Sequence, residues 1–247
     1  MRVEVGKMID FHSHILPGID DGSKDLDESL QLLLQEHHAG VDTVVFTPHF
    51  YADSDRLEPY CRRREESFQQ LKQAAGSHEE LKSMEFRLGA EAAYFPGMGE
   101  AEGLQELCIS GTDILLVELP FQQWDPQVVR DIRFLIKKQK RSVMLAHVER
   151  YVSFQKDRSY WEELFQLPVI AQMNAGCFLH GRMQTRKNLK LMAACRQVVL
   201  GTDTHNTSTR VPNLAEGRRV IAGKFGEEFL RRMDACGAQL LQGRCGT

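Results

Sequence analysis

Residues 8–22 read MIDFHSHILPGIDDG, and this stretch decides the fold because a short apolar run ends in two histidines and then opens into a loop. In an extended strand, residues two apart face the same side, so His12 and His14 would project together. In the first strand of a parallel barrel, both side chains would enter the interior at the carboxyl end, where barrels carry their sites. Two converging imidazoles can hold a cation such as Zn, Mn or Fe. Taken alone, the pair is also typical of two partly exposed histidines.

Further apolar runs follow, separated mainly by stretches with helical spacing. Several of the runs are continuous rather than alternating, as expected for strands that are covered on both faces. We therefore predict an α/β fold, a distorted (β/α)7 TIM-like barrel, built as a single domain over residues 1–247. An open doubly wound sheet is the alternative. The expected strands lie at 8–11, 43–47, 85–90, 114–118, 142–146, 169–174 and 198–201, and the expected helices at 26–38, 57–75, 125–136, 160–165, 186–194 and 226–241.

The composition excludes several classes of protein. Of 247 residues, 42% are hydrophobic and 26% are charged, which fits a globular protein rather than a disordered chain. The net charge of -3 lacks the basic excess of a dedicated nucleic-acid binder. No apolar run is long enough for membrane insertion, and the charged start of the chain lacks the apolar segment of a signal peptide. We expect a cytoplasmic protein with six scattered, reduced cysteines: Cys61, Cys108, Cys177, Cys195, Cys236 and Cys245.

The ends of the other expected strands carry the same kinds of residue as the first. Histidine, aspartate or glutamate follows directly after nearly every apolar run, and the carboxyl ends of barrel strands form one face. Isolated ionisable groups at such positions would be costly to bury, so a shared purpose is the better explanation. The pattern predicts a metal centre at this face, with these strand-end residues beside His12 and His14: His49, Glu91, Glu118, His147, Asp203 and His205.

Together these motifs resemble the polymerase-and-histidinol-phosphatase (PHP) superfamily. The likeness is carried by HSH at 12–14, TPH at 47–49, Glu91, HVER at 147–150 and GTDTH at 201–205. The longer strings DFHSH with PGIDDG, AHVERY and NAG are similar to one branch, the bacterial manganese-dependent protein-tyrosine phosphatases of capsule and exopolysaccharide loci. The likeness extends over residues 8–243. It departs at Phe50, where many relatives have a second histidine.

The resemblance implies a PHP fold with two or three divalent metal ions. Mn is the first candidate, and the same types of ligand can also bind Fe, Zn or Co. Among the implied ligands, only Asp21 comes from the resemblance alone. The implied sets are His12, His14, Glu91 and Asp203 for one ion; Glu91, Glu118 and His147 for a second; and Asp21, His49 and His205 for a third.

Two arginines lie close to these strand ends. Arg150 comes three residues after His147 and Arg210 five after His205, so both are expected on loops at the site. A guanidinium group matches a phosphate group bidentately, and the resemblance assigns both positions to phosphate binding. The implied reaction is the hydrolysis of phosphotyrosine by metal-activated hydroxide. The implied partner is the phosphotyrosine tail of a bacterial tyrosine autokinase, while the oligomeric state stays open.

Several alternatives compete with this interpretation. A cysteine phosphatase needs an arginine six residues after its cysteine, and Cys61, Cys177 and Cys195 are followed there by Ser, Met and Gly. A histidinol-phosphate phosphatase of the same superfamily is the nearer enzyme alternative, and an amidohydrolase the more distant one. A regulatory scaffold that binds a kinase tail is the non-enzyme alternative, although no expected ligand is missing. Candidate aromatic walls of the site, for which core packing is an equal explanation, are Phe50, Tyr51, Tyr94 and Phe95.

Overall fold

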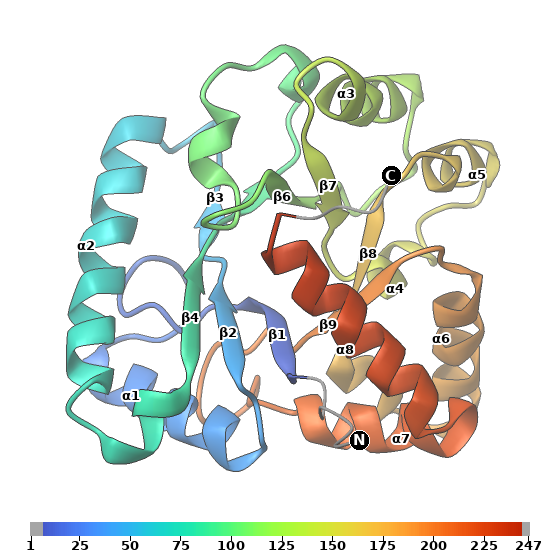
Figure 1. The fold of residues 1–247 in the computed structure, drawn as a ribbon. Helices are drawn as coiled ribbons and strands as arrows, with labels where there is room; N and C mark the ends of the chain where they lie inside the picture. Colours follow the sequence, from blue (N-terminus) through green and yellow to red (C-terminus); the bar gives the residue numbers. More distant parts are fainter. Residues whose placement is uncertain (1–6, 244–247) are drawn as a thin grey trace.

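The computed structural model describes residues 7–243, so the expectations for residues 1–6 and for Cys245 lie outside the described part. Strands and helices alternate along the chain, and Figure 1 shows the helices packed around the strands. The strands are β1 (Ile9–Ser13), β2 (Thr43–Phe46), β3 (His49–Phe50), β4 (Glu85–Leu88), β5 (Glu91–Ala93), β6 (Ile114–Glu118), β7 (Ser142–Leu145), β8 (Ile170–Asn174) and β9 (Val198–Gly201).

Every strand pairing between these elements is parallel. The hydrogen-bonded order is β1-β2-β4 in one sheet and β3-β5-β6-β7-β8-β9 in the other. Main-chain hydrogen bonds connect the region just after β9 to β1, from His14 N to Thr204 O (2.9 Å) and from Asp203 N to His12 O (2.8 Å). Because β3 continues β2 and β5 continues β4, the strands follow the predicted course of seven βα units in a distorted TIM-like barrel.

The two breaks in the strands have a local cause and a consequence for the site. Pro48 separates β2 from β3, and it has no N–H to donate to a ladder. The prediction of one continuous strand over 85–90 is wrong in its length, because Gly89 and Ala90 separate β4 from β5. The two breaks lie side by side, and β3 and β5 resume with His49 paired to Glu91. The interruption therefore brings two expected ligands to the same level of the barrel.

Two of the helices begin directly after a residue that caps them. Asp25 caps α1 (Leu26–His38), and its side chain accepts a hydrogen bond from the backbone N–H of Glu28. Asp125 caps α3 (Pro126–Lys137) in the same way, with Pro126 in the first turn. Helix α6 (Arg182–Ala194) begins four residues earlier than expected, and α4 (Val148–Tyr151) and α7 (Leu214–Phe225) were not expected. The remaining helices are α2 (Leu57–Ala75), α5 (Ser159–Gln166) and α8 (Glu227–Leu241).

Two apolar clusters hold the layers together. The smaller one collects side chains from six strands, among them Phe11, Leu116 and Met144, and therefore fills the barrel interior. Leu240 and Leu241 of α8 pack into it, and Figure 1 shows α8 lying across the strands. The larger cluster lies between the strands and the surrounding helices. Over residues 7–243, no helix combines the length and the apolar character that a bilayer crossing requires.

Candidate metal centre

The two histidines of β1 meet in a buried space at the carboxyl end of the strand. The Nε2 atoms of His12 and His14 are 3.0 Å apart. Glu91 Oε2 lies 3.2 Å from the first and 3.3 Å from the second of these nitrogens. Asp203 Oδ1, which comes from beyond β9, lies 3.8 Å and 3.6 Å from them. Four side chains expected to share one ion are therefore neighbours.

Glu91 also faces a second group of side chains through its other oxygen. Its Oε1 atom is 3.0 Å from His147 Nε2. The same nitrogen is 3.3 Å from Glu118 Oε1 at the end of β6. Glu91 itself is almost completely buried, so its carboxylate stands between two sets of imidazoles instead of facing water. This is the position that a carboxylate shared by two cations would take.

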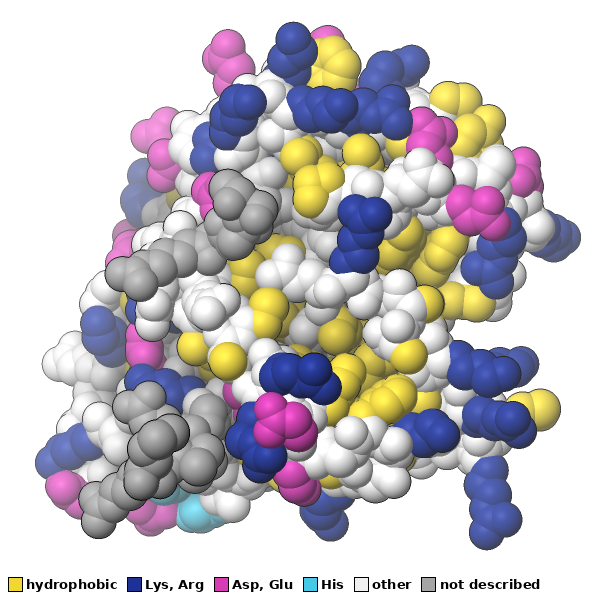
Figure 2. All heavy atoms as spheres, turned by 45° about the vertical axis from the view of Figure 1, so that its right-hand side comes forward, with side chains coloured by type: hydrophobic (Ala, Val, Ile, Leu, Met, Phe, Trp, Pro, Cys, Tyr) yellow, Lys and Arg dark blue, Asp and Glu magenta, His cyan; other side chains and the backbone are white. Residues whose placement is uncertain are grey.

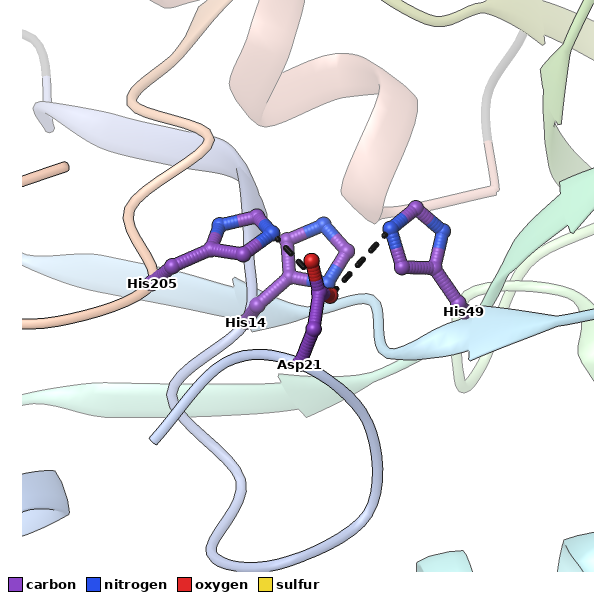
Figure 3. A group of neighbouring side chains, drawn as sticks. All are labelled: His14, Asp21, His49 and His205. Carbon is purple, nitrogen blue, oxygen red and sulfur yellow. Dashed lines mark ion pairs between the residues drawn. The ribbon is translucent and has the colours of Figure 1, made fainter. Parts of the chain in front are cut away.

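A third group lies on the solvent side of His14, and Figure 3 shows it. The Asp21 carboxylate lies between two rings, with Oδ1 3.6 Å from His49 Nε2 and 3.4 Å from His205 Nε2. The ring of His14 is 4.0 Å from that of His205, centre to centre. The donor atoms of these four residues all lie within 4.8 Å of one another. Asp21 is the most exposed member, and its loop joins β1 to α1.

Hydrogen bonds on the outer side of the rings determine which nitrogens face the centre. His12 Nδ1 donates to Gln172 Oε1 (3.0 Å), His14 Nδ1 to Asp20 Oδ2 (2.6 Å), and His205 Nδ1 to the backbone oxygen of Asp203 (2.9 Å). In its neutral form, each of these rings would therefore present the lone pair of Nε2 to the interior. Among the described residues, the buried atoms His205 Nε2, His49 Nδ1 and Glu91 Oε2 make no hydrogen bond of regular geometry, although the last two lie 3.0 Å from each other. Ring nitrogens and carboxylate oxygens that converge in this way fit a bound cation, and imidazole with carboxylate suits Mn, Fe, Zn or Co.

Protonation of the cluster leads to the same conclusion. Burial would lower the pKa of His14, but hydrogen bonds with Asp20 and Glu91 raise it to about 10. Burial would likewise lower the pKa of His147, and hydrogen bonds with Glu118 and Glu91 raise it to about 9. Without a metal, the surplus of carboxylates is therefore balanced by protons on the rings. A divalent cation would displace those protons, so metal binding at this site is expected to release them.

Three supporting residues were missed from the sequence, namely Asp20, Gln172 and Asn174 as partners of the expected ligands. Gln172 Oε1 also accepts from the backbone N–H of His147 (2.6 Å), and its Nε2 donates to Asn174 Oδ1 (3.0 Å). Asn174 Nδ2 in turn donates to Asp203 Oδ2 (2.9 Å). The two amides are two apart at the end of β8, and this spacing is the signal that could have identified them.

The backbone is strained at two of the expected ligands. His147 has a φ of 28° and Asp203 a φ of 55°, backbone angles that residues other than glycine rarely adopt. Both residues directly follow the end of a strand region, where the chain turns away from the barrel. Such conformations persist only where the surroundings enforce them, and they are concentrated at functional sites.

Both expected arginines reach the same carboxylate from the solvent side. Arg210 Nη2 is 2.6 Å and Arg150 Nη1 is 3.7 Å from the Asp203 oxygens. Their side chains are 40% and 45% exposed, so they border the opening of the cluster. The guanidinium of Arg150 also lies 4.6 Å from the ring centre of Phe121. Two exposed cations at the edge of a buried ligand set are suited to binding a phosphate group.

Of the four aromatic residues considered as walls of the site, three follow the alternative explanation of core packing. Phe50 is buried against Tyr60, and Tyr94 and Phe95 pack against the core, so these three do not form an open wall. Tyr51 is exposed and stacks on His49 with 5.1 Å between ring centres. Phe121 was not identified from the sequence. It is also exposed, and it stacks on His147 at 5.7 Å with 20° between the planes.

The barrel and its buried cluster of imidazoles and carboxylates define a metal-dependent hydrolase of the α/β-barrel type. The chain belongs to the CpsB/CapC family of capsular polysaccharide synthesis, whose family model matches residues 8–241. The resemblance that the motifs carry is thereby confirmed.

Individual relatives agree with this family. The chain is 26% identical over 238 residues to the tyrosine-protein phosphatase CpsB of Streptococcus agalactiae, covering 90% of this chain and 92% of that protein. It is 26% identical to the tyrosine-protein phosphatase YwqE of Bacillus subtilis, covering 90% and 87%. A crystal structure from the work on YwqE and on CpsB from Streptococcus pneumoniae, described as metal-dependent tyrosine phosphatases, superposes with a TM-score of 0.85 at 23% identity, covering 97% and 96%. The putative histidinol phosphatase of Listeria monocytogenes shares the fold with a TM-score of 0.52 at 13% identity, covering 80% and 95%.

Proposed function

We propose that this chain is a metal-dependent protein-tyrosine phosphatase that uses two or three divalent ions, with Mn as the first candidate. The observation that carries the proposal is the position of Glu91, whose two oxygens face His147 on one side and His12 with His14 on the other. One buried anion in that place can neutralise two neighbouring cations. The names of the curated relatives support phosphotyrosine as the substrate.

The proposed ligand sets follow the three groups of neighbouring side chains. We assign His12, His14, Glu91 and Asp203 to one ion, Glu91, Glu118 and His147 to a second, and Asp21, His49 and His205 to a third. The distances within each group support these assignments. So do buried atoms of His49, Glu91 and His205, which make no hydrogen bond of regular geometry in the part of the chain that the structure describes.

The residues at the opening would position the ester. When bound, the ions would neutralise phosphoryl oxygens and acidify the water that attacks the phosphorus. Arg150 and Arg210 would hold the remaining phosphoryl oxygens, exchanging their present contacts with Asp203 for contacts with the substrate. Asp20 and Gln172 would hold the imidazoles in one orientation and one tautomer throughout. A tyrosyl oxygen leaves as a phenolate, which is stable enough not to require a strong acid in the site.

The openness of the site supports a protein substrate. Tyr51, Phe121, Arg150 and Arg210 are all exposed at its edge, so a phosphorylated side chain can enter from a flexible segment. We propose that this segment is the tail of a bacterial tyrosine autokinase that controls capsule or exopolysaccharide synthesis. We further propose a cytoplasmic enzyme built as one domain over residues 1–247, which is supported by five free cysteines and by core clusters extending from β1 to α8 over the described residues.

The test compares two phosphate esters under metal control. Protein treated with EDTA and then dialysed is assayed with a phosphotyrosine peptide and with histidinol phosphate, before and after addition of Mn, Zn, Fe or Co. We expect turnover of the peptide only after metal is restored. A preference for histidinol phosphate would replace the proposal with the nearer enzyme alternative. Tight peptide binding without turnover in any metal would favour the kinase-binding scaffold, and full activity after chelation would refute the metal centre.

A further inference from the structure

Two cavities meet beside the candidate site. The first, of about 490 Å³, is lined by Asp203, Arg150 and Arg210 and so adjoins the proposed phosphate position. The second, of about 580 Å³, continues away from it between the α4–α5 region and α6, and it is lined by Arg158, Trp161 and Lys187. The cavities share four lining residues and therefore form one groove that starts at the site: Glu149, Arg150, Gln184 and Asn188.

The distal part of this groove is cationic although the chain is acidic overall. Helix α6 carries four cations and no acidic residue: Arg182, Arg186, Lys187 and Lys190. Among residues 7–243, neither Arg158 nor Lys187 takes part in an ion pair, and both are exposed. Figure 2 shows numerous Lys and Arg side chains on this side of the molecule, where α5 and α6 lie. The net charge of the whole protein is -3, so this concentration of positive charge is local.

The groove also has walls that can hold an extended chain. The guanidinium of Arg158 lies 5.5 Å from the ring centre of Trp161, which orders a cation that would otherwise be mobile. Asn188 is buried and donates to Cys177 O (2.7 Å), and Gln184 Nε2 donates to Asn188 Oδ1 (3.1 Å). These bonds leave the Gln184 oxygen available to a peptide N–H. Ordered cations and an amide acceptor in one groove are suited to an acidic peptide.

We propose that this groove binds negatively charged residues that flank the phosphotyrosine, so that the preferred substrate is an acidic peptide segment. The inference rests on the proposed function, because it assigns the phosphotyrosine itself to the metal centre. Arg158 and Lys187 would contact the flanking charges and determine specificity without taking part in the reaction. Because these cations are exposed, their effect is expected to be moderate and to weaken with salt.

The experiment compares two peptides that differ only in charge. Each carries one phosphotyrosine, flanked on both sides by glutamates in one peptide and by the nearly isosteric glutamines in the other. For the wild type at low salt we expect kcat/KM to be about three- to tenfold higher for the glutamate peptide, as one or two exposed ion pairs provide. Arg158→Glu combined with Lys187→Glu replaces the attracting cations by repelling anions and should therefore reverse this preference. Turnover of the glutamine peptide should change no more than it does in the control variant with the same net charge.

A matched control lies on the same helix. Arg186→Glu combined with Lys190→Glu changes the net charge equally, but neither residue lines the groove, so the preference should remain. An absent preference in the wild type, or an equal loss in both double variants, would overturn the inference while leaving the phosphatase proposal intact. If neither peptide is hydrolysed, the phosphatase proposal fails, and fluorescence anisotropy with the same peptides decides about the groove. Equal binding of both peptides by the wild type would overturn the inference. The inference would also be overturned if the wild type bound anionic vesicles and only the variant with Arg158→Glu and Lys187→Glu lost this binding, because the groove would then recognise a membrane surface.

Discussion

Gln172 supports three of the proposed ligands at once, and its replacement by leucine is the sharpest structural test of the site. Its buried Oε1 atom accepts from His12 Nδ1 (3.0 Å) and from the backbone N–H of His147 (2.6 Å). Its Nε2 atom holds Asn174, which donates to Asp203. Gln172→Leu is close in size but removes the three hydrogen bonds that Gln172 itself makes. Two buried donors would lose their acceptor, at a cost of about 1 to 3 kcal/mol each.

The same change should weaken metal binding. Removing a group that orients a metal ligand typically costs about 10- to 100-fold in affinity, which corresponds to about 1.4 to 2.8 kcal/mol. Isothermal titration of EDTA-treated, dialysed protein with Mn measures this directly, and urea unfolding without metal measures the loss of stability. Gln172→Glu keeps an acceptor for His12 and should retain most of the affinity. If the Gln172→Leu variant bound Mn as tightly as the wild type, Gln172 would have no part in orienting the metal ligands.

Three further outcomes are expected from other parts of the molecule. His147→Ala should lower kcat/KM by more than about 100-fold, beyond the usual effect of a residue that only orients a ligand, while the circular dichroism spectrum stays unchanged; near-normal turnover would remove His147 from the ligand set. Phe121→Ala should weaken inhibition by phenylphosphonate about two- to tenfold, the effect of one lost aromatic contact, but leave inhibition by methylphosphonate unaffected. Phe121→Tyr keeps the ring and should be inhibited like the wild type by both compounds, whereas an equal loss for both inhibitors in Phe121→Ala would contradict recognition of the ring. Burial raises the pKa of the Cys108 thiol from 9.0 to about 11, so its contribution to stability is complete below pH 9 and is lost as the pH rises towards 11. Between pH 8 and pH 10.5, the free energy of unfolding in urea should therefore fall by about 2 kcal/mol more for the wild type than for Cys108→Ala, and equal losses would argue against the shift.

Much of the fold could be predicted because its signals are local. Continuous apolar runs mark strands covered on both faces, and β1, β2 and β9 are buried along their whole length. The start of α3 follows from the capping residue Asp125 and Pro126. The strand breaks at Pro48 and at Gly89–Ala90 were missed, since a broken strand and a continuous one have nearly the same apolar pattern over so few residues.

The proximity of the strand-end side chains was predictable for a related reason. Parallel strands end at one edge of a barrel, so residues that directly follow the strands meet in space however far apart they are in the chain. That rule brings His12, Glu91 and Asp203 together. The rule could not show that Phe121 stacks on the ring of His147. Nor could it show that the guanidinium of Arg64 is buried and donates to Gly89 O (3.1 Å), because Arg64 belongs to a run of three arginines that is typical of a solvated helix surface.

The sequence by itself therefore determined most of the alternation of strands and helices, because periodicity is local, and it showed which ionisable side chains follow the strands. Only the tertiary structure decided that Gln172 and Asp20 orient the imidazoles, that Phe50 is buried while Tyr51 is exposed, and that a cationic groove leads away from the site. These features depend on which strand lies beside which and on how the loops fold over them. Contacts of that kind join residues with no periodic relation in the chain, and burial and hydrogen bonding in the folded state select them.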